Sequence, residues 1–572
     1  MHAGARHELD APSRFAAAGV DCRSVPRHPD CAGAGSGRRG PGEGRRDCHG
    51  GDVAGRAGDE NRYGGSAARR VGRRGGCAPE VRHVERRGVR VYGRLAPEGA
   101  RRRAHGLLSD GEEVVAAEGG HAGQSVLRNL DAHVRRVQVR LAFTKHTLDN
   151  GLDVLLHQDR GCPIVAVNLW YHVGSKNEQP GHTGFAHLFE HLMFEGSQHY
   201  DRGYFQPLQG AGATLNGSTN ADRTNYWEVV PANALELALW MESDRMGYLL
   251  PALTDAKFSN QRDVVLNERR QNYENRPYGL APMALLAALY PPDHPYHWTT
   301  IGEIADLNTV RLDEVQAFFR RYYHPANASI ALAGDIDLDD ALGLVRTYFE
   351  DIDAGDRVVP VVAAAALSGD IRIFFEDRVE LPRLYVAWLT PAMFADGDAD
   401  LDLGTDLLAN GKTSRLYRRL VFEERIATDV SAAQNSREIA GYAQITATAA
   451  PGHTLGEIEQ VILEEVTRLA AGGPSDDEIE RGRVQAEAQF MYRLQTVGGF
   501  GGKSDQLNAY NVFLGDPEYF ERDLARYHDV TSQSLQETVA HYLDPAHRVT
   551  LSIVPRGRAT LAAPDSSPTD VS

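Results

Sequence analysis

From about residue 140 onward the hydrophobic positions form a regular pattern of short apolar runs and longer amphipathic stretches. Short apolar runs bounded by turn residues predict strands, and longer stretches with an apolar stripe predict helices. We expect strands at 152–158, 163–175 and 224–231, and helices at 185–196, 231–250 and 257–275. The two kinds of element interleave irregularly, and a turn signal at Asp149-Asn150-Gly151 precedes the first strand. This irregular order predicts an α+β fold.

Two stretches of the chain share one layout, which indicates an internal repeat. The stretch RGCPIVAVNLWYHVG…HTGFAHLFEHLMFEGS resembles RVELPRLYVAWLTPA…DLDLGTDLLANGKTS. Each runs from a proline through a strand, a loop and a helix to a glycine, so that Pro163 corresponds to Pro382 and Gly196 to Gly411. We therefore predict two similar α/β halves. A chance match between two α/β units is the alternative.

Residues 1–140 differ in composition from the rest of the chain. They contain 26 Arg, no Lys and 17 acidic residues, a net charge of +9, whereas the remaining 432 residues carry 35 basic and 61 acidic residues, a net charge of −26. Gly- and Arg-rich runs dominate, and the segment lacks the apolar surface that would offset the entropy of ordering it. We predict a disordered extension or sequence outside the mature protein. An Arg-rich nucleic-acid-binding arm is the alternative, but such an arm usually carries interleaved aromatic residues.

The repeat and the change in composition together predict how the chain is organised. We expect an Arg/Gly-rich extension at 1–140, a catalytic repeat at 141–355 and a linker at 356–368. A second, metal-free repeat is expected at 369–560, followed by a disordered tail at 561–572.

The distribution of apolar residues and cysteines excludes several classes of protein. No stretch approaches the ~18–20 apolar residues of a membrane span, and the first 30 residues lack the apolar run of a secretory signal. Cys162 is the single cysteine after residue 140, which excludes an intrachain disulfide framework there. The four earlier cysteines include no Cys-x-x-Cys pair, so they do not indicate a zinc site.

The helix expected at 185–196 carries His187-Leu188-Phe189-Glu190-His191, the reverse of the His-Glu-x-x-His zinc motif. At about 100° per residue, positions 187, 190 and 191 share one helix face. Two imidazoles one turn apart can bind one metal ion, and the carboxylate beside them can act on a water molecule. The helix is otherwise rich in Phe, Leu and Met, so its three polar groups are costly to bury unless they are paired. A satisfied polar network in the core is the alternative to a metal site.

With this motif the sequence resembles the pitrilysin/insulinase-type zinc peptidases, a family that includes the mitochondrial processing peptidase. In that family a Glu about 77 residues after the second His completes the metal site, and position 268 of this chain is Glu. The resemblance covers roughly 142–560 and includes NGLDVLLHQD, GHTGFAHLFEHLMFEGS, NGSTNADRTNYWE and GKTSRLYRRLVFEERIATDVSA. It implies two repeats, each an antiparallel sheet flanked by helices, that form half of a clam-shell chamber.

The resemblance assigns roles to the residues of the motif. His187, His191 and Glu268 are expected to hold one Zn2+ per chain, and Glu190 is expected to be the general base toward a zinc-activated water. The second ring nitrogen of each His is expected to meet a carboxylate or a carbonyl. The implied activity is that of a zinc-dependent endopeptidase that hydrolyses extended peptides or unfolded protein.

Three further residues are assigned through the resemblance. The strand around Asn216 and Tyr226 is expected to bind the main chain of the substrate, although Asn216-Gly217 is also typical of a turn. Many relatives have a Glu seven residues before the third ligand, where this chain has Gln261. A neutral amide can still form a hydrogen bond to a His or to water, so Gln261 is expected to support the metal site from outside the ligand set.

The second half departs from the pattern of active relatives. They supply an Arg and a Tyr seven residues apart that hold the substrate carbonyl, whereas this chain has Val421 and Thr428 there, with Arg425 out of register. The helix of the second repeat carries no metal motif, since the corresponding positions are Asp402, Thr405 and Asp406. We therefore predict a heterodimer in which a second subunit of the same family supplies the Arg/Tyr pair, or a homodimer. A non-catalytic or partner-dependent subunit that acts mainly in peptide binding or assembly is the alternative function.

The remaining features change this picture little. The net charge of −26 after residue 140 is compatible with attraction of cationic peptides, but ordinary solubility explains it more simply. The segment 498–504 resembles a phosphate loop but has Val497 where that loop requires Gly, so we predict a flexible loop between helices. No nucleic-acid partner is predicted. Related bacterial peptidases are often periplasmic, and the resemblance extends that expectation to this chain.

Overall fold

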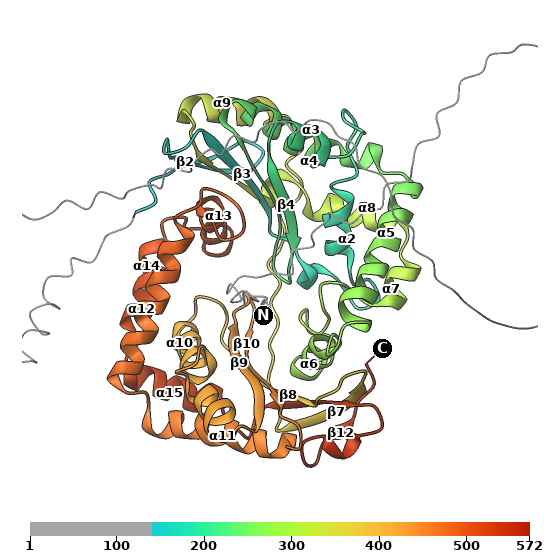
Figure 1. Cartoon of the computed structure of the whole chain (residues 1–572). Helices are drawn as coiled ribbons and strands as arrows, with labels where there is room; N and C mark the ends of the chain where they lie inside the picture. Colours follow the sequence, from blue (N-terminus) through green and yellow to red (C-terminus); the bar gives the residue numbers. More distant parts are fainter. Residues whose placement is uncertain (1–139, 572) are drawn as a thin grey trace, which may run out of the picture. The chain divides into compact units, whose positions relative to one another are not determined.

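The computed structural model of the chain describes residues 140–571 (Figure 1). The predicted extension, with its four cysteines, lies outside the described residues apart from residue 140. In the described part no helix combines the length and the apolar character needed to cross a membrane.

The first half contains a six-stranded sheet in the order β1-β2-β6-β3-β5-β4. β2 and β6 run parallel, and the other neighbouring strands are antiparallel. The sheet is therefore mixed, which refines the expected antiparallel arrangement. Its strands are β1 (Thr144–Thr147), β2 (Asp153–Gln158), β3 (Ile164–Tyr171), β4 (Thr214–Thr219), β5 (Thr224–Pro231) and β6 (Ala328–Gly334).

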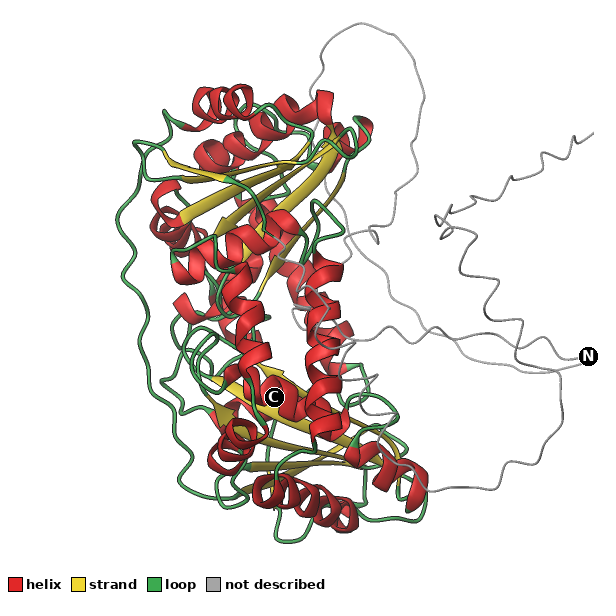
Figure 2. Cartoon of the chain, turned by 90° about the vertical axis from the view of Figure 1, so that its left-hand side faces the viewer, coloured by secondary structure: helices red, strands yellow, loops and turns green. Residues whose placement is uncertain are grey.

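The second half contains another six-stranded sheet, in the order β12-β7-β11-β8-β10-β9. β7 and β11 run parallel, as β2 and β6 do, and β11, β8, β10 and β9 follow in antiparallel order. The predicted α+β fold with two similar repeats is thus confirmed; Figure 2 shows the two sheets as separate groups of yellow strands. The strands are β7 (Ile371–Asp377), β8 (Arg383–Thr390), β9 (Ala427–Asn435), β10 (Gly441–Ala449), β11 (Val549–Pro555) and β12 (Ser567–Pro568).

Helices flank both sheets. Those of the first half are α2 (Phe185–Leu192), α3 (Phe205–Gly210), α4 (Leu235–Ala252), α5 (Asp255–Arg269), α6 (Ala281–Leu289), α7 (Ile304–Thr309), α8 (Leu312–Tyr322) and α9 (Leu338–Phe349). Those of the second half are α10 (Asp398–Ala409), α11 (Leu455–Gly472), α12 (Asp476–Arg493), α13 (Lys503–Leu514), α14 (Phe520–Asp529) and α15 (Ser532–Tyr542). Two π-helical turns, η4 (Arg270–Glu274) and η6 (Tyr417–Glu423), follow α5 and α10, and short 3-10 turns are η2 (Ser175–Asn177), η3 (Ala232–Ala234), η5 (Pro325–Asn327) and η7 (Ala559–Leu561).

The two halves share an apolar joint. Each sheet has its own hydrophobic core, and a third cluster combines α6 of the first half with β7, β8 and β11 of the second. In that cluster Leu285 and Leu286 are buried together with Tyr385 and Leu551. Since apolar burial is the main favourable term in folding, this cluster holds the second sheet against the segment that follows α5.

Helix α13 of the second half also packs on the first sheet, beside β3 and β6 (Figure 1). Leu507 of α13 packs against Leu155 and Ala331 of the sheet. The contact also has a polar part, in which Asp505 Oδ1 accepts hydrogen bonds from Asn168 Nδ2 (3.2 Å), Trp170 Nε1 (2.9 Å) and Asn225 Nδ2 (3.2 Å). Alternation along β3 places Asn168 and Trp170 opposite the face that packs in the core. The Gly-rich loop before α13 therefore leads into a contact between the halves.

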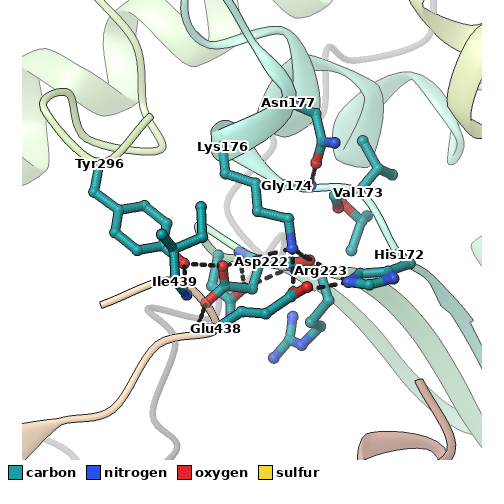
Figure 3. A network of polar contacts seen from close by, with 12 residues as sticks. His172, Val173, Gly174, Lys176, Asn177, Asp222, Arg223, Tyr296, Glu438 and Ile439 are labelled. Carbon is teal, nitrogen blue, oxygen red and sulfur yellow. Dashed lines mark hydrogen bonds and ion pairs between the residues drawn. The ribbon is translucent and has the colours of Figure 1, made fainter. Parts of the chain in front are cut away.

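A buried polar network joins the halves on another side (Figure 3). Lys176 contacts Glu438, which lies in the loop between β9 and β10, and Glu438 also accepts from His172 at 2.7 Å. Tyr296 donates to Asp222 Oδ1 at 2.5 Å and accepts from the backbone N–H of Ile439 at 3.0 Å. These contacts attach the β9–β10 loop to the loop between β4 and β5, next to the candidate site.

Candidate metal centre

Helix α2 begins at a sharply defined point. Gly184, directly before it, has a φ of 89°, and a Cβ there would lie 3.0 Å from the carbonyl oxygen of Ile301, so this position favours glycine. The buried carboxylate of Glu178 accepts hydrogen bonds from the N–H groups of Gly184 and Ala186 at 2.9 Å, and from Trp298 Nε1 at 3.1 Å. These bonds occupy N–H groups that a helix leaves free at its start. Burial raises the pKa of Glu178 to about 8, although the three donors oppose the shift.

The three predicted ligands lie together. His187 and His191 project from α2, and α5 packs on α2 and carries Glu268. Glu268 Oε2 lies 3.7 Å from His187 Nε2 and 3.4 Å from His191 Nε2, and one ligand atom of each residue lies within 4.8 Å of the others. Ligands about 2.1 Å from a tetrahedral zinc ion would be about 3.4 Å apart, so the spacing fits one metal ion.

The hydrogen bonding of these residues leaves room for a metal ion. Glu268 Oε1 accepts from Asn272 at 3.2 Å, but the buried Glu268 Oε2 has no hydrogen-bond partner within residues 140–571. Buried carboxylate oxygens are normally satisfied, so this oxygen is open to a ligand. His187 Nδ1 also lacks a partner in this part of the chain, so the carboxylate or carbonyl expected there is not present.

The protonation equilibria of the site follow from burial and proximity. Burial, with the nearby His191, lowers the pKa of His187 to about 4, which keeps its imidazole neutral as a metal ligand must be. For His191, burial opposes a charge, but the nearby carboxylates of Glu268 and Glu190 outweigh it and raise the pKa. For Glu268, burial likewise opposes the charge, and the contact with His191 outweighs it and lowers the pKa. A metal ion binds the neutral imidazole and the ionised carboxylate, so metal binding would release any proton that these groups carry.

Glu190 is buried beside the ligands. Burial raises the pKa of Glu190, and the neighbouring His191 and the Thr219 hydroxyl partly offset that effect. Thr219 is the last residue of β4, so the outermost strand of the first sheet ends at this carboxylate. No local sequence pattern marks Thr219 for this role, because its nearness to Glu190 depends on how β4 and α2 pack.

A cavity of about 620 Å³ opens beside the ligands. His187, Glu268 and Thr219 line it from the first half. Arg383, Tyr385 and Gln444, on β8 and β10, line it from the second half. The second sheet therefore forms one wall of the cavity that contains the candidate ligands, and no local sequence pattern marks Arg383, Tyr385 or Gln444 for this position.

The other predicted site residues lie in different surroundings. Asn216 is on β4, so Asn216-Gly217 belongs to an edge strand rather than to a turn. Tyr226 on β5 is fully buried, and its hydroxyl donates to the carbonyl oxygen of Phe189 at 3.3 Å, so it supports α2 from behind and does not line the cavity. The amide of Gln261 on α5 donates to Glu195, and it also contacts His191.

The positions noted in the second half lie apart from the cavity. Val421 is in η6, and Thr428 is an exposed residue of β9, the outermost strand of the second sheet. Arg425 is exposed and donates to the carbonyl oxygen of Phe422. Asp402, Thr405 and Asp406 are buried on α10, together with most of the apolar residues of that helix.

Comparison with known families agrees with this arrangement. A family model described as Insulinase (Peptidase family M16) matches residues 153–295, and another described as Peptidase M16 inactive domain matches residues 309–485. The chain belongs to the insulinase family. The candidate metal ligands fall in the part that matches the first model, and the metal-free repeat falls largely in the part that matches the second.

Several members of the insulinase family are similar over most of this chain. The zinc protease PqqE of Helicobacter pylori is 26% identical over 415 residues, which span 72% of this chain and 92% of the relative. A probable mitochondrial-processing peptidase subunit beta of Arabidopsis thaliana is 24% identical over 395 residues, 66% of this chain and 72% of the relative. The crystal structure of a protease from Helicobacter pylori superimposes with a TM-score of 0.68 at 24% identity, covering 73% of this chain and 100% of that one.

Proposed function

We propose that this chain is a zinc-dependent endopeptidase that hydrolyses extended peptides, with His187, His191 and Glu268 as the metal ligands. The observation that carries the proposal is the gathering of three ligand atoms within 4.8 Å, one of which, Glu268 Oε2, has no hydrogen-bond partner in residues 140–571. Relatives that are named zinc proteases support the choice of zinc. Zinc supplies a Lewis acid at the scissile carbonyl group when bound.

We assign the proton transfers to Glu190. It shares a helix face with both His ligands and is buried beside them, and the hydroxyl of Thr219 orients its carboxylate. In this assignment the carboxylate takes a proton from the attacking water and delivers it to the nitrogen of the leaving amine.

We assign the binding of the peptide main chain to β4. Within the described part of the chain this outermost strand pairs with β5 alone, so its other edge is available for an extended peptide to add as a further strand. β4 ends at Thr219 in the cavity, so a peptide bound along it would pass Glu190. The side chain of Asn216 accepts a hydrogen bond from the N–H of Gly217 and so holds the backbone of this strand.

We further propose that a second subunit of the same family completes the site, as a heterodimer or a homodimer. Val421 and Thr428 stand where active relatives have the Arg/Tyr pair, and this half matches the model of an inactive domain. A relative that is named as one subunit of a processing peptidase supports such an assembly. The same observations favour the second candidate function, that of a non-catalytic or partner-dependent subunit.

The test is zinc content and turnover of the purified full chain. We expect one zinc per chain by mass spectrometry, and chelator-sensitive cleavage of a quenched peptide. Glu190→Gln should keep the zinc and lower turnover by about 10²–10⁴-fold, the range of general acid–base catalysis. Normal turnover by Glu190→Gln would contradict the assigned base. Zinc without turnover by the chain alone, followed by turnover after adding a second family member, would support the partner-dependent function.

A further inference from the structure

The wall of the cavity that the second half provides has a defined chemistry. Arg383 and Tyr385 are two residues apart on β8, so they share one face of that strand, and the alternate residues Leu384 and Val386 pack in the core of the second half. The neighbouring strand β10 adds Gln444. Arg383 is thus the cationic group that the second sheet presents to the cavity containing His187 and Glu268.

The guanidinium group of Arg383 is held in place without an ion pair. Its Nε donates to Thr448 Oγ1 at 2.8 Å, directly across the strand pair, and Thr448 in turn donates to Asp429 at 3.2 Å. The guanidinium carbon lies 3.8 Å from the centre of the Tyr278 ring, a cation–π contact. No carboxylate of residues 140–571 forms an ion pair with Arg383. A charged group fixed in this way, with no carboxylate of the described residues as its ion-pair partner, is suited to an anion of a ligand.

Tyr278 is itself held in an unusual conformation. Its φ is +60°, a region that bulky side chains rarely adopt, and such strain persists only where the surroundings enforce it. The second half supplies the restraints: Asp377 accepts from the N–H of Tyr278, and the carbonyl oxygen of Leu381 accepts from its hydroxyl, both at 2.8 Å. Tyr278 lines the cavity, so the strained residue and the fixed guanidinium form one unit in its wall.

The charges that line the cavity differ from those of the chain as a whole. Within residues 140–571, two guanidinium groups line it, those of Arg276 and Arg383, and the one lining carboxylate is that of Glu268, the proposed metal ligand. The net charge after residue 140 is −26, which would favour cationic peptides if long-range attraction decided the substrate. The lining of the cavity indicates the opposite preference at the site itself.

We propose that Arg383, fixed by Thr448 and Tyr278, binds a carboxylate of the peptide substrate, so that the site selects peptides with an acidic side chain or a free C-terminus near the cleaved bond. This inference rests on the proposed function and adds a substrate class to it. Arg383 is then a specificity residue, distinct from the Arg/Tyr pair that active relatives use to hold a carbonyl group.

The experiment measures binding separately from turnover. The probes are fluorescently labelled ten-residue peptides that are identical except for Glu or Gln at one position, and this position is moved through the whole peptide. Each peptide is made with a free and with an amidated C-terminus. Dissociation constants are measured by anisotropy on the full-length, zinc-loaded Glu190→Gln protein, alone and combined with Arg383→Gln, Arg383→Lys or the control Arg425→Gln.

We expect the Glu peptide to bind about tenfold more tightly than the Gln peptide at one position, as a charge-assisted hydrogen bond provides. Arg383→Gln should reduce that ratio to about one, Arg383→Lys should keep part of it, and Arg425→Gln should leave it unchanged. If the preference follows the free C-terminus, the terminal carboxylate is the ligand; if it follows Glu, the side chain is. An absent preference, or an equal loss for Glu and Gln peptides, would overturn the proposal. A failure of the proposed function gives a different result. The unchanged chain then cleaves none of the peptides, whereas the Glu190→Gln protein still shows the Arg383-dependent preference in binding.

Discussion

Helices α2 and α10 occupy corresponding places beside two similar sheets, yet their buried polar groups have different partners. Beside α10, the Tyr527 hydroxyl donates to Asp402 Oδ2 at 2.5 Å and Asn410 Nδ2 donates to Asp406 Oδ1 at 3.1 Å. At α2, His187 Nδ1 and the facing Glu268 Oε2 have no hydrogen-bond partner in residues 140–571. Helices α12, α14 and α15 pack on α10, and the cavity beside it has only about 40 Å³, whereas α2 borders the cavity of about 620 Å³.

The two halves share one fold but treat their buried polar groups differently. Burying polar groups is costly unless each meets a partner. The second half meets that condition with its own side chains, so α10 behaves as an ordinary core helix. The first half leaves ligand atoms open at α2, and a metal ion would supply the partner they lack. If this interpretation is correct, changes at the two helices should separate metal binding from stability.

The largest effect is expected from Glu268→Gln. The change removes one of three metal ligands, so zinc affinity should fall by more than about 100-fold, beyond the 10–100-fold typical of groups that only support a ligand. Competition with a chromophoric chelator measures this affinity. Asp406→Asn on α10 is the matched control and should keep the affinity of the unchanged chain. Unaltered zinc binding by Glu268→Gln would place the third ligand elsewhere.

Zinc itself should stabilise the fold through α2. A ligand that binds the native state at 100 times its dissociation constant adds about 2.7 kcal/mol to the free energy of unfolding. We therefore expect a chelator to lower the unfolding temperature of the zinc-loaded chain in calorimetry. His187→Ala should show no such shift between added zinc and chelator. A zinc-dependent shift of full size in that variant would point to a different metal site.

A smaller effect on stability, and none on metal binding, is expected from Asp402→Asn. The change removes the charge from the hydrogen bond with Tyr527, so the free energy of unfolding should fall by about 1–2 kcal/mol. Urea unfolding measures the loss. Zinc affinity should equal that of the unchanged chain, since α10 holds no ligand. A drop in zinc affinity would mean that the two helices are coupled through the joint between the halves.

The smallest effect is expected from a lower pH, which acts on the ion pair between Arg415 and Glu478. Arg415 lies in the segment that follows α10. Arg415 holds both carboxylate oxygens of Glu478 at the start of α12, and its hydrogen bonds lower the pKa of Glu478 to about 2 from an ordinary 4.5. A lowered folded-state pKa adds stability above pH 4.5, and that contribution disappears as the pH falls toward 2. The pair is partly exposed, so its contribution is on the order of 1 kcal/mol.

The measurement is the free energy of unfolding of the unchanged chain and of Glu478→Gln at several pH values between 5 and 2. The difference between the two should shrink as the pH falls. A difference that stays constant over this range would mean that the Arg415–Glu478 pair does not contribute through its charge.

Local sequence patterns predicted much of the candidate site. The 3.6-residue period of a helix puts His187, Glu190 and His191 on one face whatever the rest of the chain does. The apolar runs predicted β2, β3 and β5, and the shared layout after Pro163 and Pro382 predicted two repeats, because each of these patterns involves neighbouring residues. Glu268 was reached through the resemblance to a family, since nothing local marks it as a partner of α2.

Other features depend on how distant segments pack. The parallel pairing of β2 with β6 joins residues that are far apart in sequence, and no single strand reveals its neighbour. The Gly-rich loop before α13 gives no local indication that α13 packs on the first sheet through Asp505. Tyr226 was assigned to a substrate-binding strand through the resemblance, but the alternation of β5 turns its side chain into the core.

Local sequence was therefore sufficient for the motif, the repeat and most elements, because helical and strand periods arise from interactions a few residues apart. The approach of Glu268 to α2 and the strained Tyr278 beneath Arg383 were decided by the packing of α5 on α2 and of the second sheet on α6. Such contacts form only when segments 77 to 105 residues apart in the chain come together. Their side chains carry no local signal of the partners that they will meet.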